Sequence, residues 1–178
     1  MQAQFTPREV AELSGAPKST VEKAIEEKIF TTRMVKRGHR ERRVLPAHAV
    51  AYAMIMRSVK DRMGATVRRR RATALSRLGN TEFKTWRFEL EPAVEMDVGR
   101  LVGDSMDRAA AYGAARDKLI VEDEKILGGT PVIRGTRIGV YSILGRLTHG
   151  DTVADIHSDY PELTAGSVEA AAIFARSH

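Results

Sequence analysis

Apolar and polar residues near the start of the chain follow the period of short amphipathic helices. In FTPREVAELSG, Thr6 stands as an N-cap, Pro7 fills the first helical position and Glu9 completes a capping box. Gly15 can end this helix in the left-handed conformation. The next stretch, APKSTVEKAIEEKI, again repeats apolar residues on one helical face. The pattern predicts two short helices joined by a tight turn, which is a helix-turn-helix.

The pattern then shifts toward strands and longer helices. FTTRMVKRGHRERRVLP suits a hairpin whose turn is KRGH, and a third helix is expected from about Pro46. EFKTWRFEL indicates a strand that includes Trp86 and ends at Pro92, and the stretch from Val94 to Leu119 reads as a helix. This part of the chain therefore predicts a basic β-hairpin, or wing, followed mainly by helices.

The last third of the chain begins with LGGTPVIRGTRIGV, residues 127–140. PVI, the turn RGT and RIGV suit a β-hairpin in which Gly135 takes a positive φ. Apolar stripes then predict three helices, the second capped by Thr152, with Val153 facing inward, and the third capped by Thr164. These helices predict a second helix-turn-helix shape.

The predicted fold is mainly α with small β-hairpins. An N-terminal winged helix-turn-helix domain is expected over residues 1–80, with Gly79-Asn80 as the boundary signal. A C-terminal domain, built from a β-hairpin and three helices in a helix-turn-helix-like arrangement, is expected over residues 81–178. No apolar run approaches the roughly 18 residues of a membrane span, and no secretory h-region or cysteine is present. The simplest expectation is a cytoplasmic protein without membrane contact.

Charge divides the chain in the same place. The net formal charge of the 178 residues is +6, but residues 1–80 hold 18 Lys and Arg against 7 Asp and Glu, whereas residues 81–178 hold 11 against 16. Such an asymmetry favours a basic module that binds a polyanion, and the alternative is a merely solvated surface. The candidate DNA contacts are Lys18, Ser19, Thr20 and Lys23 on the second helix and Lys36, Arg37, His39, Arg40, Arg42 and Arg43 on the hairpin. The run Arg68 to Arg71 suits either phosphate contact or a solvated linker.

Two resemblances sharpen these expectations. The order helix, turn, helix, basic hairpin, helix over about 60 residues, with FTPREVAELSGAPKSTVEKAI at its start, resembles the winged-helix DNA-binding domains of the MerR and excisionase type. It departs from them at Pro17, where such domains often have a Ser or Thr cap. From about residue 118 to 175, the motifs GG-x-PVIRGTRI and DYP-x-LT resemble the family DUF433 found in VapB-type antitoxins. That resemblance implies binding and silencing of a PIN-domain ribonuclease toxin and repression of the shared operon.

The stretch around RGTR does not fit a nucleotide site. Its glycine spacing is wrong for a phosphate loop of the Walker type, and no lysine follows. Arg134, Gly135, Thr136 and Arg137 are the candidate partner-facing residues. Two interpretations remain open for the arginines: they pair with Asp155 or Asp159 to fix the hairpin, or they reach the metal-site carboxylates of a toxin.

Function then divides into two classes. The first is an antitoxin that represses its own operon by binding double-stranded DNA, and the second is a free-standing dimeric transcriptional regulator with no toxin partner. Residues 151–178 hold five acidic residues and only one basic residue, Arg176, so we expect self-association or toxin binding there instead of DNA binding. The scattered histidines and the lack of a nucleophile motif give no catalytic residues, no metal site and no cofactor, so an enzyme is not expected. A homodimer is expected because palindromic sites are read by two-fold dimers.

Overall fold

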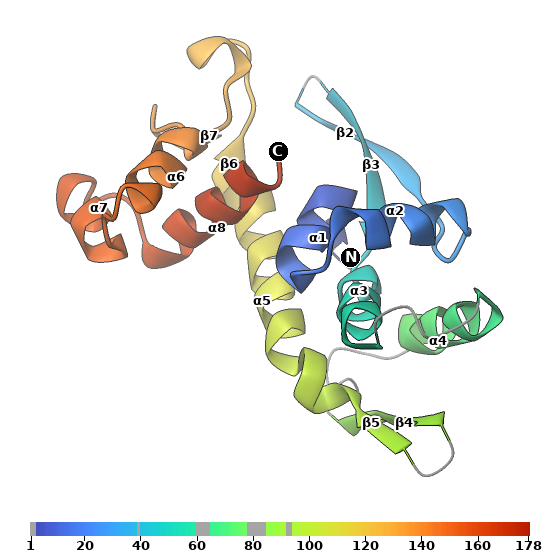
Figure 1. Ribbon diagram of the computed structural model, residues 1–178. Coiled ribbons are helices and arrows are strands. Elements are labelled where there is room, and N and C mark those ends of the chain that lie inside the picture. The colour runs from blue at the N-terminus through green and yellow to red at the C-terminus, as the bar shows by residue number, and fades with distance from the viewer. Residues whose placement is uncertain (1–2, 39, 60–64, 78–84, 92–93) are drawn as a thin grey trace. The chain divides into compact units, whose positions relative to one another are not determined.

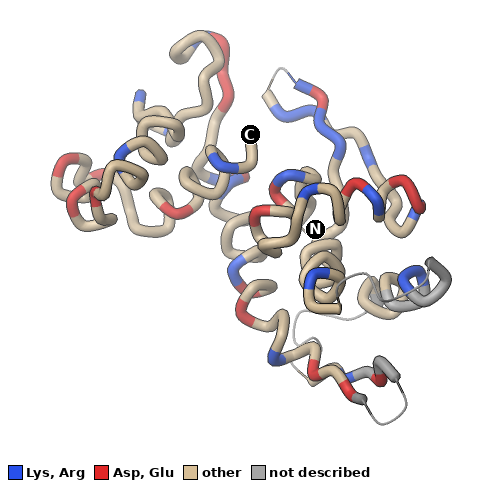
Figure 2. Tube along the Cα trace, in the orientation of Figure 1, with Lys and Arg blue, Asp and Glu red and all other residues tan. Residues whose placement is uncertain are grey.

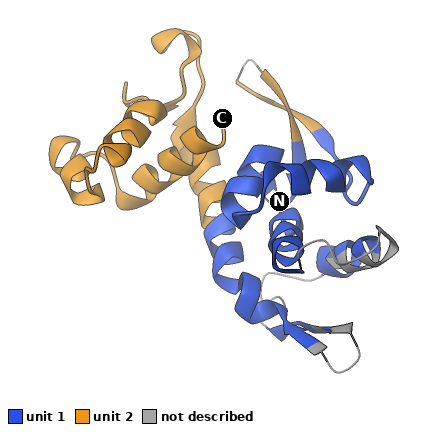
Figure 3. Ribbon diagram, in the orientation of Figure 1, with its two compact units in different colours: residues 1–33, 44–110 blue, residues 34–43, 111–178 orange. Residues whose placement is uncertain are grey.

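The computed structural model describes residues 3–38, 40–59, 65–77, 85–91 and 94–178 of the chain. It divides into two compact units (Figure 3). Unit 1 comprises residues 1–33 and 44–110, and unit 2 comprises residues 34–43 and 111–178. The hairpin tip thus belongs to the same unit as the C-terminal residues. The boundary predicted at Gly79-Asn80 lies outside the described residues.

Unit 1 begins with the two short helices that the sequence predicts, α1 (Pro7–Ser14) and α2 (Lys18–Glu26) (Figure 1). The capping box is present: Glu9 N–H donates to Thr6 Oγ1 at 3.2 Å, and Thr6 N–H donates to Glu9 Oε2 at 2.6 Å. Gly15 takes the left-handed conformation, with φ of 61°, and ends α1. Pro17 precedes α2 without a side-chain cap, so the second helix starts at the residue directly after this proline.

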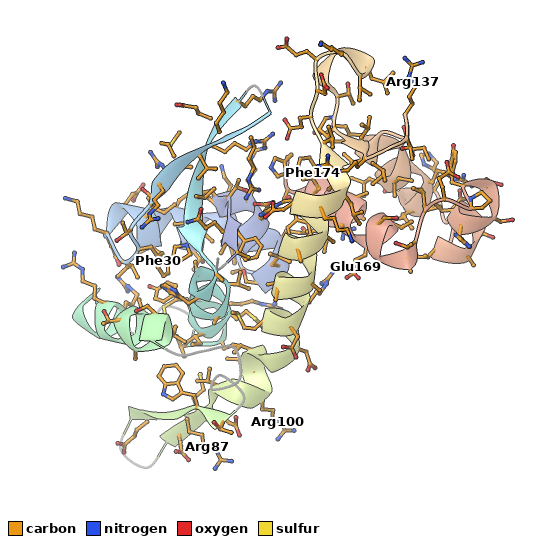
Figure 4. All side chains as sticks on the ribbon, turned by 180° about the vertical axis from the view of Figure 1, so that it is seen from behind. Phe30, Arg87, Arg100, Arg137, Glu169 and Phe174 are labelled. Carbon is orange, nitrogen blue, oxygen red and sulfur yellow. The ribbon has the colours of Figure 1, made fainter. Side chains whose placement is uncertain are left out.

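The core of unit 1 forms around α3 (His48–Val59). This helix is apolar on nearly all sides and buried along most of its length, which is typical of a central helix. Strand β1 (Gln4–Phe5) pairs antiparallel with Leu45 and Pro46 at the end of β3 (Arg40–Pro46). Strand β2 (Arg33–Arg37), most of which belongs to unit 2 with the start of β3, completes the sheet order β1-β3-β2. In Figure 4 the labelled Phe30 marks an aromatic cluster, where its ring meets that of Tyr52 edge-on at 5.0 Å. Burial lowers the pKa of the nearby His48. Helix α4 (Ala65–Arg77) packs against α3.

In the middle of the chain, the start of the predicted long helix differs from the expectation. The helix predicted from Val94 begins four residues later, as α5 (Val98–Leu119), because β5 (Val94–Asp97) pairs antiparallel with β4 (Arg87–Glu91). The Arg100 N–H donates to Asp97 Oδ1 at 3.0 Å, so Asp97 caps the helix start. Trp86 lies just before β4 and accepts a hydrogen bond from Val98 N–H at 2.9 Å.

In unit 2 the segments on either side of the RGTR turn pair as a short hairpin: Val132 bridges Gly139, Ile133 N–H donates to Ile138 O at 2.9 Å, and Val140 N–H donates to Pro131 O at 3.0 Å. The sequence did not predict the second partner of this hairpin, since strand β7 (Val132–Ile133) also pairs antiparallel with β6 (Ile120–Val121). Gly135 has a positive φ of 79°, as predicted. A 3-10 turn, η2 (Leu127–Gly129), precedes β7.

Three helices complete unit 2, with caps as the sequence predicts: α6 (Val140–Thr148), α7 (Val153–Asp159) and α8 (Ala165–Arg176). Thr152 caps α7 and Thr164 caps α8. Val153 was expected inward, but its side chain is 40% exposed, whereas Ile156 is fully buried. Helix α8 is buried on most sides and packs against α6 and α7. The described chain is therefore mainly helical with small antiparallel sheets, and none of its described helices is long and apolar enough to cross a membrane.

Candidate nucleic-acid interface and partner-binding turn

Helix α2 presents polar side chains on one face and packs with the other. Val21 and Ala24 are each 2% exposed and pack within unit 1, where α2 contacts α1 and α3. Lys18, Ser19 and Lys23 are exposed. The helix is therefore held by its apolar face while its amino-terminal polar side chains face solvent.

The exposed face of α2, where the predicted DNA contacts lie, carries charges of both signs. Lys18 Nζ lies 2.8 Å from Glu22 Oε1, an i,i+4 ion pair between side chains that are each about half exposed. An exposed pair of this kind contributes little to stability, at most about 1 kcal/mol.

Hairpin residues differ in exposure from one position to the next. Met34, Lys36 and Arg43 are exposed, whereas Arg37 and Arg42 are partly buried. Alternate residues of a strand point to opposite faces, which accounts for this division. Figure 2 shows the concentration of Lys and Arg along both strands. The predicted contact His39 lies outside the described residues.

Arg42, one of the predicted DNA contacts, forms an ion pair within unit 2. Its Nη2 donates to both carboxylate oxygens of Glu122, at 2.9 and 3.1 Å, and the two side chains are 15% and 7% exposed. Arg37 Nη2 lies 3.8 Å from Asp117 Oδ1. The sequence pattern missed Glu122 and Asp117 because they lie about 80 residues from the hairpin, and only the acidic run VEDE near them gave any signal.

The arginine run in α4 also has internal partners. Arg68 is 8% exposed and holds Glu27 with two hydrogen bonds, one of them from Nε to Oε2 at 2.9 Å. Arg69 Nη2 donates to the backbone carbonyl of Glu27 at 2.8 Å. The run therefore lies on a helix, not on a linker, and its first two members bind the end of α2. The side chains of Arg70 and Arg71 are outside the described ones.

The RGTR turn borders an open pocket of about 640 Å³ in unit 2. Thr136 organises the turn, since its hydroxyl donates to Ile133 O at 2.8 Å and accepts from Ile138 N–H at 3.0 Å. Arg134 is anchored by its Nε, which donates to Lys118 O at 2.6 Å. Arg137 is exposed and extends away from the ribbon (Figure 4). The pocket is also lined by Ser142, Tyr160, Glu162, Thr164 and Ser167.

The carboxylates that were expected to pair with these arginines have other partners. Arg146, not Arg134 or Arg137, binds Asp159, with its Nη2 2.6 Å from Oδ2, and its Nε donates to Asp151 at 2.5 Å. These two carboxylates raise the pKa of Arg146. Asp155 accepts hydrogen bonds from the hydroxyl and the N–H of Thr152, and these bonds lower the pKa of Asp155. The structure thus contradicts the predicted pairing of the turn with Asp155 or Asp159.

The described residues contain no group of three or more His, Asp or Glu side chains placed to hold a metal ion. Exposed lysine and arginine side chains lie on α2 in unit 1 and, separately, on the hairpin and the RGTR turn in unit 2.

Comparison with known proteins finds similarity in the C-terminal part of the chain. Residues 120–175, from β6 to α8, match the model of DUF433, a family described as protein of unknown function. The uncharacterized protein y4eO of Sinorhizobium fredii (strain NBRC 101917 / NGR234) is 35% identical to this chain over 83 residues, which is 47% of this chain and 37% of that relative. The chain thus spans well under two thirds of that relative's length. No solved structure shows a significant match.

The family match confirms the DUF433 part of the resemblance drawn from GG-x-PVIRGTRI. The MerR-type and antitoxin parts of that resemblance stay predictions.

Proposed function

We propose that this chain is a double-stranded-DNA-binding antitoxin of the VapB type. One part of it, a winged helix-turn-helix of the MerR and excisionase type, reads an operator. The DUF433 segment binds and neutralises a PIN-domain ribonuclease toxin, and the chain acts as a homodimer in the cytoplasm. This function needs no cofactor and no catalytic residue of the chain itself.

The observation that carries the DNA-binding proposal is the two-faced packing of α2. Its apolar residues Val21 and Ala24 are buried, while Lys18, Ser19 and Lys23 are exposed beside a tight turn at Gly15. The net charge of residues 1–80 supports the same proposal, because lysine and arginine in excess supply the salt-dependent part of DNA affinity.

The partner-binding proposal is supported by Arg137. It is an exposed cation at the edge of a pocket, within a unit whose last 28 residues contain a single basic residue. An arginine fork matches a carboxylate pair, and a metal-dependent ribonuclease presents carboxylates at its active site. In this proposal Arg137 reaches those carboxylates from the RGTR turn.

The DNA-binding proposal is tested by selecting duplexes from a random library with the full chain. Binding to the selected duplex is then measured by fluorescence anisotropy over a series of salt concentrations. Replacing Lys18 and Lys23 together by Ala should weaken binding to the selected duplex about tenfold or more and reduce its preference over random DNA. Lys125→Ala, an exposed lysine of unit 2, is the control and should leave both unchanged. Equal binding by all three proteins would contradict the role of α2.

The antitoxin is distinguished from a free-standing dimeric regulator by co-expression with the protein encoded by the adjacent gene. A stable complex that suppresses ribonuclease activity supports the antitoxin. Arg137→Ala should release that suppression while Lys125→Ala keeps it. DNA binding without any such complex would favour the regulator.

A further inference from the structure

Within unit 2 the hairpin residues 34–43 are held by an ion pair of long sequence separation. Arg42 Nη2 reaches both carboxylate oxygens of Glu122, at 2.9 and 3.1 Å, and Glu122 is only 7% exposed. A charge that is buried to this extent is costly without its partner, so the two side chains hold each other in place. The pair therefore fixes where the hairpin lies against the end of β6.

Backbone contact at the same point supports this docking. A Cβ placed on Gly38 would lie 2.8 Å from Glu122 Cβ and 3.0 Å from its carbonyl oxygen, so the hairpin turn and residue 122 touch directly. The Arg42 guanidinium also lies 5.9 Å from the ring centroid of Phe174, which stacks on His178 with 4.0 Å between centroids. Arg42 thus has an ionic and an aromatic partner on the DUF433 segment.

We propose that Glu122 is a positioning residue for DNA binding. It anchors Arg42 on the inner face of the hairpin and so presents the exposed Lys36 and Arg43 to phosphate. This inference rests on the proposed function, and it assigns Arg42 an internal role in place of a DNA contact. Glu122 lies at the start of the DUF433 segment, so this anchor links the DNA-binding hairpin to that segment.

Whether a substitution of Glu122 weakens or strengthens DNA binding tests its role as an anchor. Removing any carboxylate near DNA should strengthen binding slightly, because a negative charge repels phosphate. Glu122→Gln should instead weaken binding of the full chain to its selected duplex by about fivefold or more, because the hairpin loses its anchor. Glu124→Gln, which removes an exposed carboxylate two residues away, is the matched control and should bind as tightly as the unchanged chain or slightly tighter. Binding by Glu122→Gln that equals or exceeds that of Glu124→Gln would overturn the proposal.

An apolar replacement separates anchoring from direct contact. A well-packed hydrophobic pair can replace a buried ion pair. The double variant Arg42→Met, Glu122→Leu should therefore restore most of the affinity that Glu122→Gln loses. Failure to restore it, with the variant folded as judged by circular dichroism, would mean that the Arg42 charge itself is needed and would overturn the internal role.

Limited digestion with trypsin tests, without any DNA, whether Glu122 holds the hairpin in place. The hairpin offers several cleavage sites, at Arg33, Lys36, Arg37, Arg40, Arg42 and Arg43. Mass spectrometry should show faster cleavage within residues 33–43 of Glu122→Gln, whereas Glu124→Gln should be cleaved at the unchanged rate. Equal cleavage of the two variants would overturn the anchor. If the unchanged chain bound no duplex DNA, the proposed function would fail and this digestion would still decide whether Glu122 holds the hairpin.

Discussion

Gly135 shows how one residue sets the shape of the partner-binding turn. Its φ is 79°, and a Cβ built there would meet no atom within 4 Å. Backbone strain, not a steric clash, is therefore what any other residue would suffer. Gly145 provides the opposite case: it lies inside α6, has ordinary helical geometry, and its Cβ position is also open.

These two glycines give a matched prediction of opposite sign. Gly135→Ala should lower the free energy of unfolding by about 1–2 kcal/mol, the cost of a left-handed residue with a Cβ. Gly145→Ala should raise the free energy of unfolding by about 0.5–1 kcal/mol, because alanine is favoured over glycine inside a helix. Urea denaturation followed by circular dichroism measures both changes. A shift of the two variants in the same direction would contradict this account of the turn.

Among elements, helix α4 has an ionic link to α2 that its sequence did not reveal. The four arginines suggested phosphate contact or a linker, but Arg68 is buried against Glu27. Removing one partner of a buried pair leaves an uncompensated charge. The stability of unit 1, and not its DNA affinity, should therefore depend on Arg68.

Arg68→Ala should lower the free energy of unfolding by about 3 kcal/mol, the lower end of the range for a buried pair, since Glu27 is 23% exposed. Arg69→Ala is the control, because Arg69 is exposed and bonds only a backbone carbonyl, and its effect should stay below about 1 kcal/mol. Denaturant midpoints measure stability and anisotropy measures DNA binding. A loss of DNA affinity by Arg68→Ala at unchanged stability would instead favour phosphate contact.

For the whole molecule, the expected assembly follows from how DNA is read. A single short helix with a hairpin covers few base pairs, and two-fold dimers read palindromic sites. We therefore predict that the full chain is a homodimer. Analytical ultracentrifugation at about ten micromolar protein should give twice the mass of one chain, and the selected duplexes should contain inverted repeats. A monomer bound to a non-repeated site would contradict the prediction.

Local signals in the sequence determined much of the secondary structure. The capping box of Thr6 and Glu9, the left-handed Gly15 and the caps Thr152 and Thr164 act within a few residues, so their positions could be read directly. The motif GG-x-PVIRGTRI likewise identified the DUF433 segment. The exposed cations of α2 followed from the same periodicity, because a helix that buries Val21 and Ala24 must turn its other face to solvent.

Only the tertiary structure decided which distant residues meet. Strand β7 pairs with Ile120–Val121 on one side, in addition to the RIGV segment that follows the turn, and nothing in the local sequence pointed to Ile120–Val121. Arg42 forms an ion pair with Glu122, and Arg146 forms one with Asp159. These pairs depend on how strands and helices pack and not on spacing in the chain. The sequence shows how many lysines and arginines are present. Burial determines which of them can still contact a ligand, and burial arises only when the chain has folded.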